Sequence, residues 1–342
     1  MENNFLIRNS FNFAYQNEKS KKTFKIISLI IIIVYYYIYY LKPFNKLFKE
    51  LKNEDDVKLY LRNKTEFYFK HRLKTLEIAK YNYNESNLIT FQDKLNYLLI
   101  HENPELKTNI VDKIKIHEYS KKILGKDICP PILKVYEKVD EINLNELPEQ
   151  FVLKANHGSG MNIICKDKLH FDINMAKTQL EKWKNINYAL LGSEFQYFLI
   201  NRKIFAATYL GDKIIDYEVY CFNGQPKFIR VQKTLNKQNY TALHNYYNLD
   251  WKLTDIETGL NIYFRIPEIK IEKPKNFNLM IDYSKKLSAN FVFVRIDFYE
   301  INNTVYLSEM TFSPSNCLMK LKNLNQSIYL GSLMDITKIR KT

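Results

Sequence analysis

Two strand-like runs near the C-terminal end strongly limit the folds open to this chain. Residues 291–301 (FVFVRIDFYEI) and 304–312 (TVYLSEMTF) are rich in β-branched and aromatic residues, and only Asn302-Asn303 separates them. Such composition favours strands, and a two-residue connection containing Asn joins neighbouring antiparallel strands. The sequence therefore predicts a β-hairpin, and with it an antiparallel sheet.

Short strand-like runs bounded by turn residues begin after Pro130. They span about residues 132–136, 151–154, 162–165, 203–210, 214–222 and 226–233. The Asn223-Gly224 pair between the last two is a strong hairpin signal. Because helices and hairpins mix without a regular βαβ repeat, the predicted fold class is α+β.

Helices are expected before and between these strands. Residues 47–81 have the spacing of two basic amphipathic helices. Thr90 is a suitable N-cap for a helix that ends at Asn103-Pro104, and Gly125 is a suitable end for a helix over 108–124. The remaining expected helices span about 172–186 and 276–288.

Composition and charge narrow the class of partner. Hydrophobic residues make up 46% and charged residues 26% of the chain, which is neither a disordered nor a fully membrane-embedded composition. The net charge of +14 suits an anionic partner such as a nucleotide, a membrane surface or an acidic polymer, and it is also common on Lys-rich surfaces. Without an RNP, KH or helix-turn-helix pattern, no nucleic acid is expected. The four cysteines lack metal or disulfide spacing, so free thiols are expected.

The N-terminal region contains an uncharged run over residues 26–41 (IISLIIIIVYYYIYYL), with Lys25 before it and Lys42 after it. Sixteen residues of helix rise about 24 Å, less than the ~30 Å hydrocarbon core of a membrane. Three arrangements remain open: a membrane span, a surface-lying or re-entrant helix, and a buried helix of a soluble protein. The expected location is the cytoplasm, with residues 26–41 as the candidate membrane attachment.

A lysine and a glycine-containing loop follow the run that ends at residue 154. The loop reads Ala155 to Gly160 (ANHGSG), and Lys154 precedes it directly. Glycines let backbone N–H groups approach phosphate oxygens, while a strand fixes the lysine ammonium beside them. The spacing matches neither a P-loop nor a dinucleotide-binding fingerprint. The pattern indicates phosphate binding, with a plain hairpin loop as the alternative.

The C-terminal hairpin combines an arginine with carboxylates. Arg295 and Asp297 share one strand face, and Glu309 lies on the next strand. Two converging carboxylates suit Mg²⁺, which prefers oxygen ligands; cross-strand ion pairs on a surface hairpin are the alternative. Asp112-Lys113 is expected to open the helix before Gly125, where a lysine opposes the helix dipole and so points to an anion elsewhere, or to a solvated helix face.

In this order, these pieces resemble the ATP-grasp superfamily, and more closely its TupA-like branch, linked to teichuronopeptide and capsular polysaccharide synthesis. The resemblance covers roughly residues 90–334. The stretches that carry it are TFQDKLNYLLIHENPELKTNIVDKIKIHEYSKKILG, LPEQFVLKANHGSGMNIICKDK, DYEVYCFNGQPKFIRVQ and FVFVRIDFYEINNTVYLSEMTFSPSN. It implies two α+β subdomains whose antiparallel sheets clasp ATP. The expected organisation is a basic segment with a hydrophobic helix over 1–45, a helical region over 46–107 and the ATP-grasp region over 108–336.

The resemblance also implies roles for single residues. It assigns the phosphates of ATP to Lys113, Lys154, His157, Gly158, Ser159 and Gly160. It assigns Mg²⁺ to Asp297, Glu309 and Thr311, and the transferring phosphoryl group to Arg295 and Lys154. The hinge at Phe205 to Leu210 would contact adenine through Thr208, Tyr209 and Leu210. The chain departs from its relatives at Ala207, where they usually carry Glu, and at Asn316, where they usually carry Gly; Asn tolerates left-handed geometry.

The implied activity is amide formation driven by ATP. A carboxylate attacks the γ-phosphate of ATP to give an acyl-phosphate and ADP, and an amine then attacks the acyl-phosphate to give an amide and phosphate. An acidic surface polymer or an amino acid would be the acceptor. Two other classes remain open: a non-enzymatic membrane-associated ATP-grasp-like binding protein, suggested by Ala207 and residues 26–41, and a capsule glycosyltransferase, for which the sequence offers no D-x-D pair at a strand end.

Overall fold

The computed structural model describes residues 72–73, 76–77, 79–189, 193–212, 214–236, 241–258, 263–264 and 271–339. All of them belong to one unit, Tyr68–Thr342. The expected hydrophobic helix at 26–41 and most of the expected helices at 47–81 lie outside the described residues. No helix in the described part of the chain is long and apolar enough to cross a membrane.

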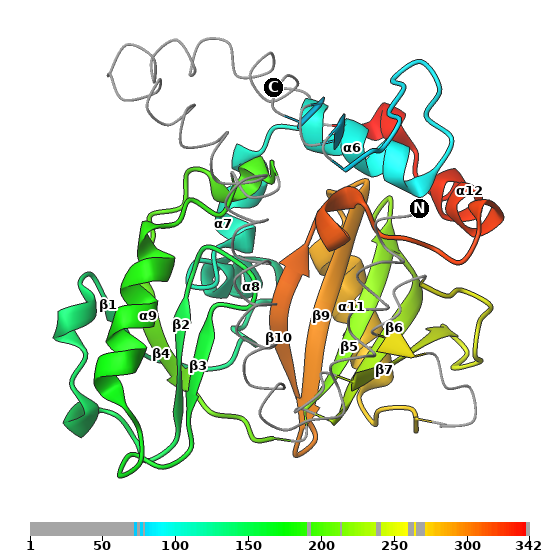
Figure 1. The fold of residues 1–342 in the computed structure, drawn as a ribbon. Coiled ribbons are helices and arrows are strands. Elements are labelled where there is room, and N and C mark those ends of the chain that lie inside the picture. The colour runs from blue at the N-terminus through cyan, green and yellow to red at the C-terminus, as the bar shows by residue number, and fades with distance from the viewer. Residues whose placement is uncertain are drawn as a thin grey trace, which may run out of the picture. The chain divides into compact units, whose positions relative to one another are not determined.

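Two sheets form the framework of this unit (Figure 1). In spatial order, the smaller sheet contains β1 (Ile132–Tyr136), β4 (Ile204–Thr208), β2 (Phe151–Ala155) and β3 (Asn162–Cys165). The larger sheet contains β10 (Thr304–Thr311), β9 (Phe293–Ile301), β5 (Ile215–Phe222), β6 (Gln225–Asn236), β7 (Thr241–Asn248) and β8 (Tyr263–Phe264). Their neighbouring strands are antiparallel except for β7 and β8, which confirms the predicted α+β class.

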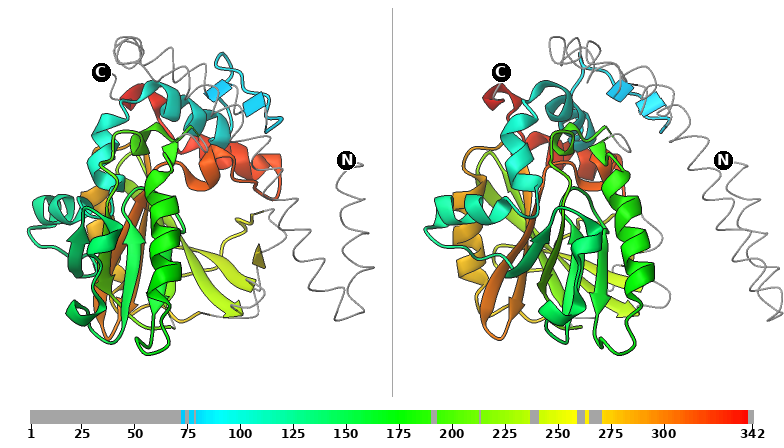
Figure 2. Two further views of the ribbon diagram at one scale, coloured as in Figure 1. Left: turned by 60° about the vertical axis from the view of Figure 1, so that its left-hand side comes forward. Right: turned by 90° about the vertical axis from the view of Figure 1, so that its left-hand side faces the viewer.

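Helices cover the two sheets separately (Figure 1, Figure 2). The α-helices are α6 (Phe91–His101), α7 (Glu105–Val111), α8 (Ile116–Leu124), α9 (Ile173–Asn185), α11 (Phe277–Ser288) and α12 (Leu324–Ser332). Helix α9 packs against β2 of the smaller sheet, while α11 packs against β5, β6 and β9 of the larger one. Short 3-10 turns lie at Val139–Glu141, Leu144–Glu146, Phe195–Tyr197, Pro314–Cys317 and Ile336–Lys338.

Alternation along the strands divides the larger sheet into an apolar and a mixed face. Val219, Ile229 and Ile296 point from one face into a buried cluster that includes Leu287 of α11. On the other face, Tyr220 and its aromatic neighbours pack beneath α6 and α12 at one end of the sheet. The rest of this second face is polar, so the cavity described below lies on it.

The predicted helix starts and turns are largely confirmed. The Thr90 hydroxyl accepts a hydrogen bond from the Asp93 N–H at 3.1 Å, and the Asp93 carboxylate accepts one from the Thr90 N–H at 3.0 Å, which forms a capping box for α6. Gly125 ends α8 with a left-handed φ of 75°. Asn302 and Asn303 both have positive φ values, 50° and 61°, as a tight two-residue hairpin turn requires.

The prediction of one helix over residues 108–124 is wrong, because the chain breaks into α7 and α8. The Asp112 carboxylate accepts hydrogen bonds from the N–H groups of Ile114 (2.9 Å) and Lys115 (3.4 Å). The N–H of Lys113 donates to the Asn156 carbonyl at 3.1 Å. A side-chain acceptor that captures backbone donors competes with the helix. Lys113 therefore lies in the turn between the helices and not in a first helical turn.

The chain after β10 forms a strained turn. Ser315, Asn316 and Cys317 have consecutive φ values of 50°, 56° and 58°. The left-handed geometry expected to be tolerated by Asn316 is thus present, and it extends to both neighbours. For residues other than glycine this conformation costs roughly 1–2 kcal/mol each, so the surroundings must hold the turn.

Helix α12 approaches the start of α6 at a glycine. A Cβ atom at Gly331 would lie 2.3 Å from the Ile89 carbonyl oxygen and 2.8 Å from the Thr90 carbonyl carbon. Both neighbours are backbone atoms that cannot rotate away, so a side chain at this position would force the helices apart. The glycine therefore lets segments far apart in the sequence pack backbone to backbone.

Candidate functional site

A cavity of about 320 Å³ is lined by residues from both sheets. The smaller sheet and its β2–β3 loop contribute Lys154, Ser159, Gly160, Met161, Asn162, Phe205 and Ala207. The larger sheet contributes Asp216, Glu218, Arg230, Gln232, Arg295, Asp297, Tyr299, Leu307, Ser308 and Glu309. The remaining wall is formed by Lys113, Ile116, His117, Cys129 and Pro130. The cavity is thus lined mainly by polar and charged groups.

Charged side chains form a row across four strands of the larger sheet. Glu309 on β10 pairs in register with Asp297 on β9, Asp297 with Glu218 on β5, and Glu218 with Arg230 on β6. Cross-strand partners lie on the same face of a sheet. The row therefore presents three carboxylates and one guanidinium to the same side.

Arg295 connects the predicted carboxylates to each other. Its Nε and Nη2 donate to the two oxygens of Asp297 at 2.8 and 2.6 Å. The same Nη2 lies 3.1 Å from Thr311 Oγ1 and 3.4 Å from Glu309 Oε1. The planar guanidinium fork suits this two-pronged contact. Arg295, Asp297, Glu309 and Thr311 therefore form one cluster.

Two lysines approach this cluster from the other side of the cavity. Lys113 Nζ donates to the Gly158 carbonyl at 2.8 Å and lies 3.4 Å from Glu309 Oε2. Burial, and then repulsion from Lys113, lower the pKa of Lys154 to about 8, against the opposing effect of Glu309. Burial acts to raise the pKa of Glu309, but Lys113 and Arg295 outweigh it and hold that pKa at about 2. The site therefore combines ionised Glu309 with two closely spaced lysines.

Several residues singled out from the sequence lie outside the cavity lining. His157 is buried, and its Nε2 hydrogen-bonds with the Trp183 carbonyl at 3.0 Å beneath the loop. Thr208 ends β4, and Tyr209 and Leu210 follow it beyond the strand. Among the hinge residues, Phe205 and Ala207 line the cavity.

Sequence reasoning missed the four lining residues on β5 and β6 of the larger sheet. These are Asp216, Glu218, Arg230 and Gln232. Arg230 donates from Nε and Nη2 to the two oxygens of Glu218, with the Nη2 bond at 2.7 Å. Burial, with the carboxylates of Glu218 and Glu309, raises the pKa of Asp216 to about 7. The sequence did contain a signal for the two acids on β5. Asp216 and Glu218 are two residues apart, and side chains at alternate positions of a strand lie on the same face.

The sequence pattern of the TupA-like ATPgrasp family matches residues 93–335. The chain belongs to this family. The match contains both sheets and every cavity-lining residue named above, so this TupA-like ATPgrasp chain carries its site within the matched region. No protein with a curated description matches its sequence.

Solved structures resemble this TupA-like ATPgrasp chain more distantly. D-alanine–D-alanine ligase from Bacillus anthracis, in complex with ATP, is 16% identical; the alignment covers 78% of this chain and 81% of the ligase with a TM-score of 0.41. N5-carboxyaminoimidazole synthetase from Staphylococcus aureus is 14% identical, covering 59% and 44%, with a TM-score of 0.34. L-amino acid ligase from Bacillus licheniformis is 11% identical, covering 60% and 43%, with a TM-score of 0.38. The chain spans less than half the length of the last two.

The donor set of the TupA-like ATPgrasp chain fits a hard cation. Asp297, Glu309 and Thr311 offer two carboxylates and a hydroxyl on adjacent strands, and Thr311 Oγ1 lies 3.3 Å from Glu309 Oε1. Mg²⁺ takes oxygen ligands and usually binds one or two carboxylates together with phosphates and water. These residues are the ones that would hold the ion.

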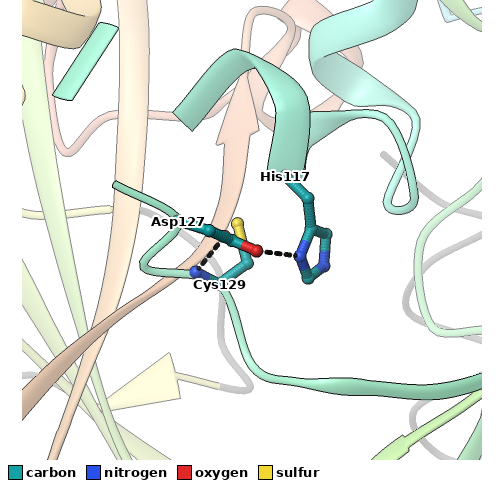
Figure 3. Close-up of side chains that lie close together, drawn as sticks. All are labelled: His117, Asp127 and Cys129. Atoms are coloured by element: carbon teal, nitrogen blue, oxygen red, sulfur yellow. Dashed lines mark hydrogen bonds and ion pairs between the residues drawn. The ribbon is translucent and has the colours of Figure 1, made fainter. Parts of the chain in front are cut away.

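Figure 3 shows one further cluster of side chains, in which His117 and Cys129 line the cavity and Asp127 lies beside them. The ligand atoms of His117, Asp127 and Cys129 lie within 4.8 Å of one another. Asp127 accounts for this arrangement, because its carboxylate lies 2.7 Å from His117 Nδ1 and accepts the Cys129 N–H at 2.9 Å. Burial, with Asp127 beside it, raises the pKa of the Cys129 thiol well above its usual range, which keeps it protonated. Internal hydrogen bonding thus explains the cluster.

Proposed function

We propose that this chain is an ATP-dependent ligase that activates a carboxylate as an acyl-phosphate and joins it to an amine, giving an amide. The observation that carries the proposal is the cavity between the two sheets, where Lys113 and Lys154 face the cluster of Arg295, Asp297 and Glu309. Anionic phosphates and a divalent cation are the ligands whose charges complement these two groups.

Each group would have a distinct task in the transfer. Lys113 and Lys154 would bind the phosphates of ATP, and Ser159 and Gly160 would cover them from the β2–β3 loop. Arg295, held by Asp297, would stabilise the charge of the transferring phosphoryl group. Bound Mg²⁺ would screen the negative charge that the lysines leave uncompensated. The amine would then attack the acyl carbon and release phosphate.

The proposed substrate class rests on the resemblance to the TupA-like family and on the net charge of the chain. The TupA-like resemblance suggests a role in cell-surface polysaccharide or polymer synthesis, and the net charge of +14 favours an acidic surface polymer as acceptor. Attachment to a membrane through residues 26–41 would bring the enzyme to such a polymer. Cell fractionation of the full chain and of a chain starting at Pro43 tests the attachment: both in the soluble fraction would contradict it.

A binding protein without turnover is the second candidate. It is favoured by Ala207, which lines the cavity and offers adenine no side-chain hydrogen bond. Such a protein would bind ATP but release no ADP in the presence of any carboxylate and amine.

The test combines ATP calorimetry with an assay of ADP formation over a panel of carboxylates and amines in the presence of Mg²⁺. Amine-dependent ADP formation together with an amide product is the expected result. ATP binding without ADP formation for any pair would favour the binding protein. A full chain that does not bind ATP would overturn both candidates.

A further inference from the structure

The left-handed turn Ser315–Cys317 is held by a side chain from far away in the sequence. The side chain of Arg72 is completely buried beside it. Its Nη1 donates to Asn316 Oδ1 at 2.9 Å, and its Nη2 donates to the Asn316 carbonyl at 2.7 Å. Two donors thus fix both the side chain and the backbone of the central residue of the turn. Strained backbone persists only where its surroundings determine it in this way.

Arg72 is itself fixed by a second contact. Its Nε donates to Asn96 Oδ1 at 2.7 Å, and Asn96 Nδ2 donates to the Cys317 carbonyl at 3.3 Å. Asn96 is completely buried in α6. Arg72 and Asn96 together therefore hold the turn at two consecutive residues, Asn316 and Cys317.

The near side of the turn has its own anchor. Ser313 Oγ donates to the Glu194 carboxylate, and Gln196 Nε2 donates to Ser313 Oγ at 2.8 Å. Ser313 lies two residues after Thr311 and four residues after Glu309 at the end of β10. Both sides of the turn are therefore tied to buried polar groups, and the strand that leads into it carries the proposed metal ligands.

We propose that Arg72 is a positioning residue for the active site: it holds the left-handed turn, and through the end of β10 it aligns Glu309 and Thr311. Arg72 precedes the family-matched region, which begins at residue 93. The segment before that region would thus contribute to the site. The consequence for activity rests on the proposed function, whereas the hold on the turn does not.

The guanidinium shape matters for this task. A buried charge is weak evidence for stability, because apolar residues of similar volume often replace it without loss. A rigid fork of donors, in contrast, matches two acceptors of one residue at a fixed spacing, which the single ammonium of lysine does not reproduce. Arg72→Lys therefore keeps the positive charge but removes the fixed pair of hydrogen-bond donors.

The first experiment measures hydrogen exchange in the full chain without nucleotide. In Arg72→Lys, the amides of segment 313–318 should exchange at least about tenfold faster relative to those of β5, since the turn opens locally. Leu287→Ala is the control, because it removes a completely buried side chain beneath the opposite face of the larger sheet. The control should speed exchange in both segments alike. An unchanged ratio in Arg72→Lys would overturn the proposal.

The second experiment measures ATP turnover as a function of Mg²⁺ concentration. Arg72→Lys should lower kcat by about 10²-fold, because small displacements of reacting groups are that costly, and should raise the Mg²⁺ concentration for half-maximal rate. Affinity for ATP without metal should be unchanged. If Arg72 only stabilised the fold, the molecules of Arg72→Lys that remain folded would need the same Mg²⁺ concentration as the wild type. That result would contradict the proposal.

Relief of strain provides the rescue. Glycine adopts left-handed geometry without a penalty, so in an Asn316→Gly background the loss on Arg72→Lys should be smaller than in the wild type. If Arg72→Lys lowered the activity by the same factor in both backgrounds, Arg72 would not act by holding the turn. If the wild type shows no ATP turnover, the proposed function fails, and the exchange ratio still decides whether Arg72 holds the turn.

Discussion

The two sheets bring charge to the cavity in different states of compensation. On the larger sheet, Arg230 is paired with Glu218 and Arg295 with Asp297, each through two hydrogen bonds. On the smaller sheet, burial and Lys113 lower the pKa of Lys154 to about 8. The arginines of the larger sheet are thus paired with carboxylates before a ligand arrives, whereas the surroundings of Lys154 disfavour its charge until an anion binds.

The difference predicts opposite responses to removing a charge. Truncating one partner of a buried ion pair leaves the other charge uncompensated. Removing a cation that its surroundings disfavour relieves the folded state instead. Removing a paired charge from the larger sheet should therefore lower the stability of the fold, whereas removing Lys154 from the smaller sheet should weaken ATP binding.

The largest effect is expected at the buried pair of the larger sheet. Glu218→Gln should lower the free energy of unfolding by about 3–5 kcal/mol, because Arg230 stays buried without its partner. Glu146→Gln is the matched control, because its exposed ion pair with Lys134 of β1 should contribute little to the free energy of unfolding. Chemical denaturation measures both. Equal losses would show that burial does not distinguish the two pairs.

The next effect concerns turnover. Glu309→Gln should lower the rate of ATP hydrolysis by at least ~10²-fold, worth about 3 kcal/mol, because the proposed metal loses a charged ligand. Its melting temperature should fall, because Lys113 and Arg295 lose the carboxylate with which they pair, but less than in Glu218→Gln, because the Glu309 side chain is 34% exposed. Asp297→Asn should reduce the rate similarly and also lower the melting temperature, because Arg295 keeps a weaker partner. Full activity in both variants would remove the metal assignment.

How much of this cluster the sequence could predict depends on the range of the interactions. The hairpin with Arg295, Asp297 and Glu309 follows from local signals, namely the Asn302-Asn303 turn and the period of two. The break before Lys113 was not predictable in this way, because it depends on Asn156, which approaches only in the folded chain. Strand β7 was also missed. Its sequence, TALHNYYN, mixes His and Asn into a strand that the sheet supports from both sides.

The next effect concerns ATP binding by Lys154 of the smaller sheet. Lys154→Met should weaken ATP binding by about tenfold or more, equal to about 1.4 kcal/mol. The free energy of unfolding should rise rather than fall, because burial no longer acts on an ammonium group. Lys134→Met, an exposed position on β1, is the control and should leave ATP affinity unchanged. Calorimetry that finds the same affinity in all three proteins would remove Lys154 from the site.

The smallest effect is a pH dependence from the same lysine. With its pKa at about 8 in the free protein, Lys154 is mostly protonated below that pH, and bound phosphate would favour the protonated form further. Affinity for ATP should therefore be greatest below pH 8 and fall as the pH rises through 8. Calorimetry at several pH values should show this fall in the wild type and a weaker one in Lys154→Met. Identical profiles would assign the titration to another group.

The backbone contact at Gly331 constrains the order in which the polypeptide becomes a finished domain. The apolar side of α6 is buried partly by α12, yet more than two hundred residues separate the two helices. At a synthesis rate of about 5–20 residues per second, that interval lasts on the order of tens of seconds. During this time the nascent chain would expose Phe91 and Leu95, because α12 has not yet been synthesised to cover them. Early termination before α12 should consequently yield a product dependent on chaperones, whatever the state of the two sheets.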